Sequence, residues 1–303
     1  MTLSKYFLTL EELDSEEFDD LIRLSLKLKK NLRDNVPHRH LAGRTLAMIF
    51  QKPSTRTRIS FEVGMYQLGG SAINLSSGDL QLSRGESIED TARTISRYAD
   101  CIMARVYEHD QIEALARHAD VPVINGLSNT FHPCQTLADF ATMLERKGSL
   151  GDVDIAWVGD GNNVCNSMIY GTALSGATMS IATPSALRPL ERVVRKASRL
   201  TRIRLTEDPH EAVRDADVVV TDTFKSIHHD DSHEGMLYPK YQVNDHLMSL
   251  AKPDAIFMHC LPATRDREVT TSVIDGKQSA VWDEAENRLH SQKALLVRML
   301  GSP

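Results

Sequence analysis

The segment PSTRTR (residues 53–58) directly follows the run LAMIFQK and is rich in hydrogen-bond donors. Ser54, Thr55 and Thr57 offer hydroxyl and backbone donors, and Arg56 adds a planar guanidinium that matches the geometry of a phosphate. In open α/β sheets, such anions bind where a strand ends and a helix begins. Taken alone, the hexapeptide fits an ordinary capped helix with surface arginines about as well as it fits a phosphate site.

Two further segments place donors at the ends of predicted strands. Arg105 lies near the end of the run DCIMARV, and His132 and Gln135 open a predicted helix in FHPCQ. Each residue alone has an ordinary structural explanation, as a surface ion pair, a helix cap or a solvated first-turn residue. Together they place arginine, imidazole and carboxamide donors beyond one sheet edge, which is what polarising a carbonyl attached to a phosphate requires.

The second half of the chain carries polar residues at comparable strand ends. Cys260 ends a predicted strand within HCLP, Asp222 ends another, and Asn163 closes the segment GDGNN. A lone strand-end cysteine is more often packed and inert, and Asp222 alone could cap a helix. GDGNN lacks the G-x-G-x-x-G spacing that close approach of a dinucleotide pyrophosphate demands, so a nicotinamide cofactor is not predicted.

Short apolar runs alternate with longer amphipathic segments, the pattern of βα units around parallel sheets. Predicted strands lie at residues 44–50, 71–75, 100–106, 121–125, 153–159, 177–183, 216–222 and 254–260, with a further candidate at 279–283. We therefore predict an α/β fold of two doubly wound parallel-sheet domains, residues 1–148 and 149–303, with a hinge at 145–154. The last helix, at about residues 286–300, is expected to fold back on the first domain.

The composition is that of a globular protein without a basic face. The 303 residues are 41% hydrophobic and 25% charged, with a formal net charge of −6, which argues against a nucleic-acid partner. The four cysteines contain no CxxC pair, so neither a disulfide framework nor a zinc cage is indicated. The acidic N-terminus does not read as a signal peptide and no apolar run approaches membrane-spanning length, so we expect a cytoplasmic protein with no membrane partner.

Three motifs in the same order resemble one enzyme family. FQKPSTRTRISFE, FHPCQTLAD and FMHCLPA are similar to the motifs of the ornithine and aspartate carbamoyltransferases, and the resemblance runs over nearly the whole chain. It implies a first domain that binds carbamoyl phosphate, a second that binds the amine acceptor, and a homotrimer or multiple of trimers with active sites shared between neighbours. The implied chemistry uses no metal and no cofactor.

The family motifs assign candidate roles residue by residue. By this resemblance, the carbamoyl-phosphate site would comprise Ser54, Thr55, Arg56, Thr57, Gln81, Arg105, His132, Gln135, Cys260, Leu261 and Arg288. The catalytic residues among them would be Arg105, His132 and Cys260. The amino-acid site would comprise Asn163, Asp222, Ser226 and Ile227. Gln81 would reach into the adjacent subunit, although alone it reads as a solvated loop residue, as Arg288 alone reads as a solvated helix residue.

The motif HCLP points to the ornithine branch, because the aspartate branch resembles HPLP and this chain has Cys260. The expected activity is therefore carbamoyl transfer to the side-chain amine of L-ornithine, giving citrulline and phosphate within arginine metabolism. Two departures concern the acceptor side. Ser226, Ile227 and His228 stand where the ornithine branch usually has Ser-Met-Gly, and Thr264 and Asp266 replace a His and a Gly.

These departures keep two alternatives open. A relative of the same family acting on another amine, such as a modified ornithine or another diamino acid, would account for the altered loop. A non-catalytic homologue is the second alternative. The retention of Arg56, Arg105, His132, Gln135 and Cys260 argues against it, because a protein that only binds has no physical need for all five.

Overall fold

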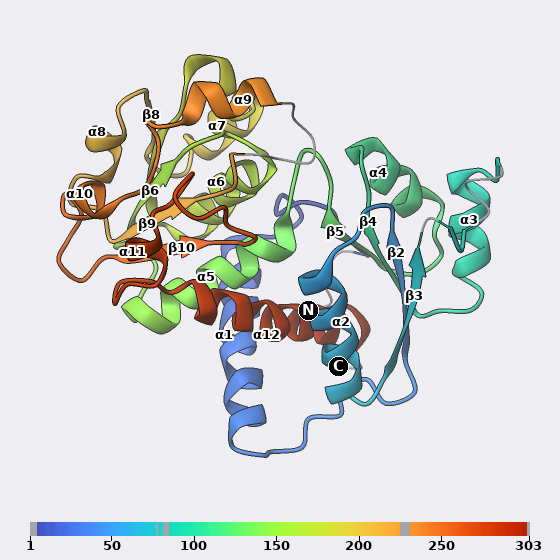
Figure 1. Ribbon diagram of the computed structural model, residues 1–303. Coiled ribbons are helices and arrows are strands. Elements are labelled where there is room, and N and C mark those ends of the chain that lie inside the picture. The colour runs from blue at the N-terminus through green and yellow to red at the C-terminus, as the bar shows by residue number, and fades with distance from the viewer. Residues whose placement is uncertain (1–4, 77, 81–84, 225–230, 302–303) are drawn as a thin grey trace. The chain divides into compact units, whose positions relative to one another are not determined.

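The computed structural model describes residues 5–76, 78–80, 85–224 and 231–301. The chain divides into two compact units. Unit 1 comprises residues 1–141 and 287–303, and unit 2 comprises residues 142–286. Each unit is built on its own five-stranded sheet, with helices packed around it (Figure 1).

The sheet of unit 1 is parallel throughout, with strand order β1-β5-β4-β2-β3. Its strands are β1 (Tyr6–Phe7), β2 (Thr45–Phe50), β3 (Ser71–Ser76), β4 (Cys101–Arg105) and β5 (Val123–Leu127). The helices are α1 (Ser15–Arg33), α2 (Thr55–Gln67), α3 (Ile88–Ile95), α4 (His109–His118) and the start of α5 (Pro133–Lys147). The central strands β2 and β4 are almost entirely buried, as their continuous apolar sequences predict for a sheet covered on both faces.

The sheet of unit 2 is also parallel, with strand order β10-β9-β6-β7-β8. Its strands are β6 (Asp154–Val158), β7 (Thr178–Ala182), β8 (Ile203–Thr206), β9 (Val218–Thr221) and β10 (Ile256–His259). The helices are α6 (Asn163–Ser175), α7 (Glu191–Ala197), α8 (Pro209–Val213), α9 (Asp231–Leu237), α10 (Asp245–Met248), α11 (Thr271–Ile274) and the start of α12 (Val281–Leu300), with a 3-10 helix η2 (Ser185–Leu187).

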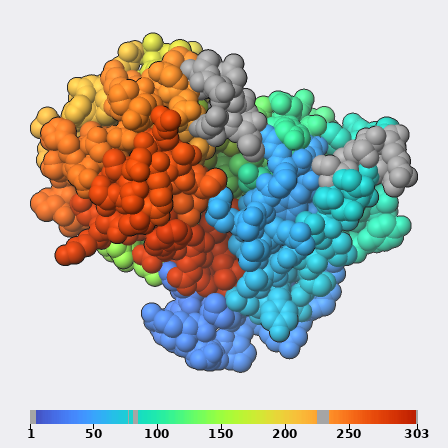
Figure 2. All heavy atoms as spheres, in the orientation of Figure 1, coloured from blue at the N-terminus to red at the C-terminus, as the bar shows by residue number. Residues whose placement is uncertain are grey.

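The predicted α/β class with two doubly wound parallel sheets is confirmed, and so is the return of the last helix to the first unit. Residues 287–300 of α12 belong to unit 1, where Lys293 Nζ donates to Gln67 Oε1 at 2.8 Å. Gly64 of α2 lies against Leu289 and Lys293 so closely that a Cβ there would meet Lys293 Cγ at 3.2 Å. In Figure 2 the atoms of this helix (red) adjoin those of α2 (blue).

Three details of the strand assignment differ from the sequence-based expectation. The candidate strand at 279–283 is wrong, because Ser279 makes only an isolated bridge to Phe257 and α12 begins at Val281. The edge strands β1 and β8 were missed. β1 is two residues long, and β8 reads IRLT, with a charged residue in a short run that carries little apolar signal. Among the described residues, none of the helices combines the length and the apolar character needed to cross a bilayer.

Candidate active site

The first part of the site lies at the carboxyl edge of the unit 1 sheet. Parallel register pairs Phe50, the last residue of β2, with Arg105 of β4 on one side and Ser76 of β3 on the other. The segment that follows Phe50 turns into α2, where the Ser54 hydroxyl accepts the Thr57 N–H at 3.4 Å as an N-cap. The PSTRTR segment is therefore a strand-to-helix connection whose amide groups point toward the sheet edge.

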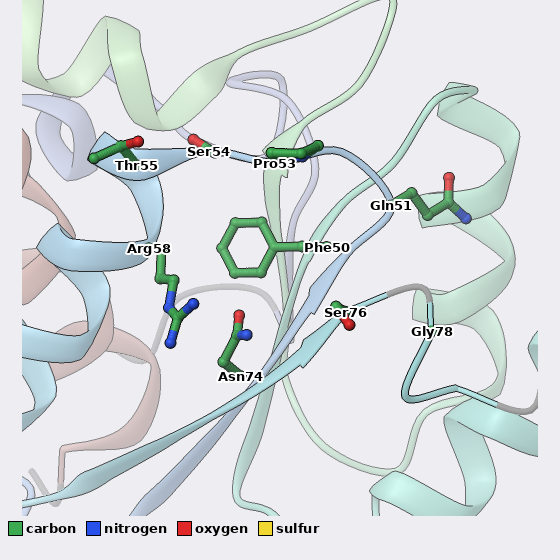
Figure 3. Close-up of a pocket in the computed structure, with 9 residues that line it drawn as sticks. All are labelled: Phe50, Gln51, Pro53, Ser54, Thr55, Arg58, Asn74, Ser76 and Gly78. Atoms are coloured by element: carbon green, nitrogen blue, oxygen red, sulfur yellow. The ribbon is translucent and has the colours of Figure 1, made fainter.

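A pocket of about 480 Å³ opens beside this connection. It is lined by Phe50, Gln51, Pro53, Ser54, Thr55, Arg58, Asn74, Ser76 and Gly78. Figure 3 shows the Arg58 side chain directed from α2 toward Asn74 of β3, with the Phe50 ring beside them. Asn74 Oδ1 is buried and accepts no hydrogen bond from the described part of the chain. Ser54 and Thr55 were predicted site residues, whereas Arg58, one turn further along α2, and Asn74 were not. Asn74 reaches the pocket through the pairing of β2 with β3.

Arg288 lies at the centre of a buried hydrogen-bond network in unit 1. Its guanidinium donates to Gln135 Oε1 at 2.6 Å and to Thr57 Oγ1 at 3.1 Å. Gln135 in turn donates to Asp139 Oδ1 at 2.8 Å. All four side chains are buried. Three residues predicted from separate motifs, Thr57, Gln135 and Arg288, are thus in direct contact, whereas the sequence of Arg288 alone suggested a solvated position.

His132 lies close enough to three arginines for their positive charges to affect its pKa. The ring is buried, and its pKa falls well below the usual value, first because of burial and then because of the charges of Arg288, Arg105 and Arg56. His132 is therefore neutral at neutral pH and surrounded by fixed positive charge. The positive charges of these three arginines favour an anion and place donors around it.

Lys52 adds a further cation that the sequence analysis did not single out. It is buried, its ammonium lies 4.1 Å from the centre of the Tyr107 ring, and its pKa is lowered by burial and then by Arg105. Lys52 immediately precedes PSTRTR, so its place in the motif was the available signal. Its position strengthens the positive potential at this edge of the unit 1 sheet.

A separate group of predicted residues lies within unit 2, around Asp222. Its carboxylate accepts hydrogen bonds from Asn162 Nδ2 at 2.7 Å, from the Thr223 N–H at 2.7 Å and from Cys260 Sγ at 3.1 Å. The register of β9 with β10 accounts for the last contact, since it pairs Thr221 with His259 and so places Asp222 beside Cys260. The predicted residues Asp222 and Cys260 therefore meet at one carboxyl edge.

The segment GDGNN supplies a structural turn as well as polar groups. A Cβ on Gly161 would lie 2.2 Å from Pro189 N, so only glycine fits there. Asn162 caps α6 by accepting the Val164 and Cys165 N–H groups, and the predicted Asn163 is the buried first residue of that helix. Asn162, whose side chain donates to Asp222, was not among the predicted residues, because two adjacent asparagines cannot be told apart by pattern.

Asp160 is a second buried carboxyl beside Asp222. Burial, and then the charge of Asp222, raise the pKa of Asp160 to about 7. Two carboxyl groups at one edge of the sheet form an environment that favours a cationic ligand such as an ammonium group.

Asp222, His259 and Cys260 also offer ligand atoms within 4.8 Å of one another, close enough for a divalent cation. The Asp222 carboxylate, Cys260 Sγ and His259 Nδ1 already have hydrogen-bond partners, whereas His259 Nε2 has none among the described residues. His259 Nδ1 accepts the Leu261 N–H at 2.9 Å, Nε2 faces Glu268 Oε1 at 3.4 Å, and Cys260 donates to Asp222. A metal would have to displace these contacts, so we interpret the cluster as a hydrogen-bonded one.

The predicted residues divide cleanly between the two units. Those in unit 1 are Ser54, Thr55, Arg56, Thr57, Arg105, His132, Gln135 and Arg288. Those in unit 2 are Asn163, Asp222, Cys260 and Leu261. Gln81, Ser226 and Ile227 lie outside the described residues, as does the rest of the altered loop at 225–230.

Comparisons of sequence and of structure match nearly the whole chain to one enzyme family. Residues 5–145 match the family model for the carbamoyl-P binding domain of aspartate/ornithine carbamoyltransferase, and residues 151–299 match that for its Asp/Orn binding domain. Ornithine carbamoyltransferase from Cenarchaeum symbiosum is 59% identical over 297 residues, covering 98% of both chains. That from Archaeoglobus fulgidus is 49% identical over 300 residues, again covering 98% of both. The solved ornithine carbamoyltransferase from Pyrococcus furiosus superposes with a TM-score of 0.94 at 47% identity, covering 100% of this chain and 99% of that one.

Proposed function

The chain belongs to the aspartate/ornithine carbamoyltransferase family, and from this premise we propose that it transfers the carbamoyl group of carbamoyl phosphate to the side-chain amine of L-ornithine. The products are citrulline and phosphate. The observation that carries the proposal is the neutral His132 held among Arg56, Arg105 and Arg288 in unit 1. This group matches a ligand that carries both a phosphate and a carbonyl.

The unit 1 residues have complementary roles in this proposal. The α2 N-terminus, Ser54 and Arg56 bind the phosphate through backbone, hydroxyl and guanidinium donors. Arg105 and His132 donate to the carbonyl oxygen, on which negative charge develops when the amine attacks. Because His132 is neutral before the substrate binds, it can donate one N–H without holding a proton that would protonate the amine.

The unit 2 residues bind and prepare the amino acid. An alkyl amine with a pKa of about 10.4 is only about one part in a thousand neutral near pH 7.4, a deficit of about 4 kcal/mol. Asp222 is proposed to bind the α-ammonium of the acceptor, with Asn163 at the amino-acid end. Cys260 lies 3.1 Å from Asp222 and so falls next to the path of the side-chain amine, where it helps to favour the neutral form.

The assembly proposed here is a trimer or a multiple of trimers. On the exposed face of α2, Ile59, Val63 and Tyr66 are 53%, 37% and 81% exposed and follow helical spacing. β3 is the edge strand of the unit 1 sheet, and its Ile73 is 50% exposed. An apolar face beside an open sheet edge is a surface that a second copy of the chain would cover. Gln81 follows this region in the sequence and is the residue proposed to serve the neighbouring site.

We place the reaction in the cytoplasm and in arginine metabolism, on the basis of the proposed product and the composition. An alternative acceptor remains worth testing because residues 226–228 depart from the Ser-Met-Gly of the ornithine branch. A different amine would use the titratable side chains of that loop to pair with an extra carboxylate or carbonyl.

A phosphate-release assay with a panel of amines separates these possibilities. The panel comprises L-ornithine, 2,4-diaminobutyrate, lysine, N-acetylornithine, N-succinylornithine and aspartate, each with carbamoyl phosphate. We expect L-ornithine to have the highest kcat/KM, and His228→Gly to leave that value equal or higher. Turnover of another amine with ornithine inert, abolished by His228→Gly, would instead identify a different carbamoyltransferase. Phosphate release with none of the amines would support the non-catalytic alternative.

A further inference from the structure

Two buried carboxylates lie under the loop that carries Cys260, and the proposed reaction gives neither of them a role. Glu268 and Glu284 are each 1% exposed. Burying a carboxylate is unfavourable unless specific donors compensate for the lost hydration. The groups that donate to each carboxylate therefore show which part of the chain it positions.

Both carboxylates accept hydrogen bonds from the backbone of residues 259–264, the segment that contains the HCLP motif. Glu284 Oε2 accepts the backbone N–H of His259 at 2.9 Å. Glu268 Oε1 accepts the backbone N–H of Thr264 through a short hydrogen bond, and the same oxygen lies 3.4 Å from Nε2 of the His259 ring. Glu268 thus contacts the loop on both sides of Cys260, through the imidazole before it and the amide after it.

The His259 ring in turn contacts the backbone of the residues that follow Cys260. The Leu261 N–H points at His259 Nδ1, 2.9 Å away, and since a backbone N–H can only donate, Nδ1 must be the acceptor. The ring proton is then on Nε2, which faces Glu268 Oε1 at 3.4 Å in a buried electrostatic contact rather than a hydrogen bond. A ring with the other tautomer would turn an N–H toward the Leu261 N–H and lose this hydrogen bond.

The backbone of Leu261 has a φ of +58°, a left-handed conformation that is unfavourable for residues with a side chain. A hydrogen bond from its N–H therefore helps to stabilise this conformation. The hydrogen bond to His259 Nδ1 fixes the turn immediately after Cys260, and the thiol of Cys260 then reaches Asp222 at 3.1 Å. The position of the thiol depends on the turn, the turn on the imidazole, and the imidazole on the carboxylate behind it.

We propose that Glu268 is a positioning residue for the acceptor half of the reaction, acting through the ring of His259 to hold Cys260 against Asp222. The inference rests on the proposed role of Cys260 beside the amine. It does not make Glu268 or His259 catalytic residues, since neither is expected to touch a substrate. It distinguishes Glu268 from a carboxylate that only stabilises unit 2.

Thiol alkylation tests the proposal without relying on activity. Cys101, Cys134 and Cys165 are buried, so iodoacetamide should react with the partly exposed Cys260, and Cys260→Ser should abolish the fast reaction. Glu268→Met fills the space but accepts no hydrogen bond, so Cys260 should leave Asp222 and be alkylated severalfold faster. Glu268→Gln keeps one acceptor oxygen and should stay close to wild type. Glu207→Gln, at a half-exposed carboxylate elsewhere in unit 2, is the matched control.

Kinetics then separate positioning from general stability. Glu268→Met is expected to raise KM for ornithine and lower kcat, with a combined loss of about tenfold or more, the effect of one lost hydrogen bond. KM for carbamoyl phosphate should change less than KM for ornithine. A merely destabilised protein would lower kcat through its smaller folded fraction and leave both KM values as they were.

Variants of His259 keep the test decisive if Glu268→Met does not fold. His259→Leu removes both the acceptor for the Leu261 N–H and the nitrogen that faces Glu268, so it should be alkylated as fast as predicted for Glu268→Met. His259→Asn can still accept the Leu261 N–H but is too short to reach Glu268, so it too should be alkylated faster than wild type. Wild-type alkylation of His259→Asn would overturn the proposal, as would a folded Glu268→Met with wild-type alkylation. If no amine is carbamoylated, the proposed function fails while the alkylation series still decides this inference.

Discussion

The guanidinium of Arg288 donates to the side-chain oxygen of Gln135 at 2.6 Å, although the two residues are 153 positions apart in the chain. The same group donates to Thr57, which is 231 positions away. The part of α12 from residue 287 onward belongs to unit 1, so the last helix completes the arginine cluster that the first domain begins. Binding of carbamoyl phosphate should therefore depend on the docking of this helix.

Arg56→Ala should weaken carbamoyl-phosphate binding by about 10- to 100-fold, because a charge-assisted hydrogen bond to phosphate contributes about 1.5–3 kcal/mol. Turnover should fall at least as far, while the unfolding midpoint stays within the scatter of controls, since Arg56 is only partly buried. Arg23→Ala, at an exposed ion pair on α1, is the control. Titration calorimetry with carbamoyl phosphate measures the effect, and unchanged affinity would remove Arg56 from the site.

Cys260→Ser should lower kcat for ornithine more than it lowers affinity for carbamoyl phosphate, because the thiol is placed beside Asp222 on the acceptor side. Serine keeps a donor to the carboxylate, so the variant should fold as the wild type does. Steady-state kinetics with each substrate varied in turn provide the test. Equal losses in both substrates would indicate a structural role for Cys260.

Lys293 makes the stability of the protein depend on pH in the alkaline range. It is fully buried, donates to Gln67 and lies 3.2 Å from His38 Nε2, and burial lowers its pKa from 10.5 to about 8. Between these two pKa values the unfolded chain binds more protons than the folded one, so the Lys293 contribution to stability increases as pH rises from about 8 to 10.5.

In Lys293→Met the side chain does not titrate, so the variant lacks the increase in stability that Lys293 contributes as pH rises. The unfolding free energy of wild type minus that of the variant should therefore increase by up to about 3 kcal/mol between pH 7.5 and 10.5 in urea denaturation. Lys27→Met, at an exposed lysine of α1, should show a much smaller change. A difference that is flat with pH would mean that Lys293 titrates alike in the folded and unfolded chains.

The exposed face of α2 provides a test of assembly. Sedimentation at micromolar concentration should give a trimer or a multiple of trimers, and Val63→Glu with Tyr66→Glu should dissociate it and reduce activity, because two charges would be buried at the contact. Tyr98→Glu, at an equally exposed aromatic outside that face, should leave the assembly intact. A fully active monomer would contradict the proposed sharing of sites between subunits.

Long apolar strands and the donors at their ends could be read from the sequence because each lies within one segment. The runs TLAMIF and IFMH became β2 and β10, and Arg105 and Cys260 emerged at the predicted sheet edges. Contacts that depend on strand register, or on packing between distant segments, could not be predicted from the sequence. The hydrogen bond from Asn162 to Asp222 and the contact of Glu268 with the His259 ring belong to this class.

Transfer of a labelled carbamoyl group tests the proposed function most directly. Carbamoyl phosphate enriched in ¹³C is incubated with the protein and L-ornithine, and the products are followed by carbon NMR while phosphate is measured in the same sample. We expect the label to appear in the ureido carbon of citrulline in amounts equal to the phosphate released, and Arg56→Ala to abolish nearly all of both. Ornithine recovered without label, while a different amine in a mixture becomes carbamoylated, would contradict it.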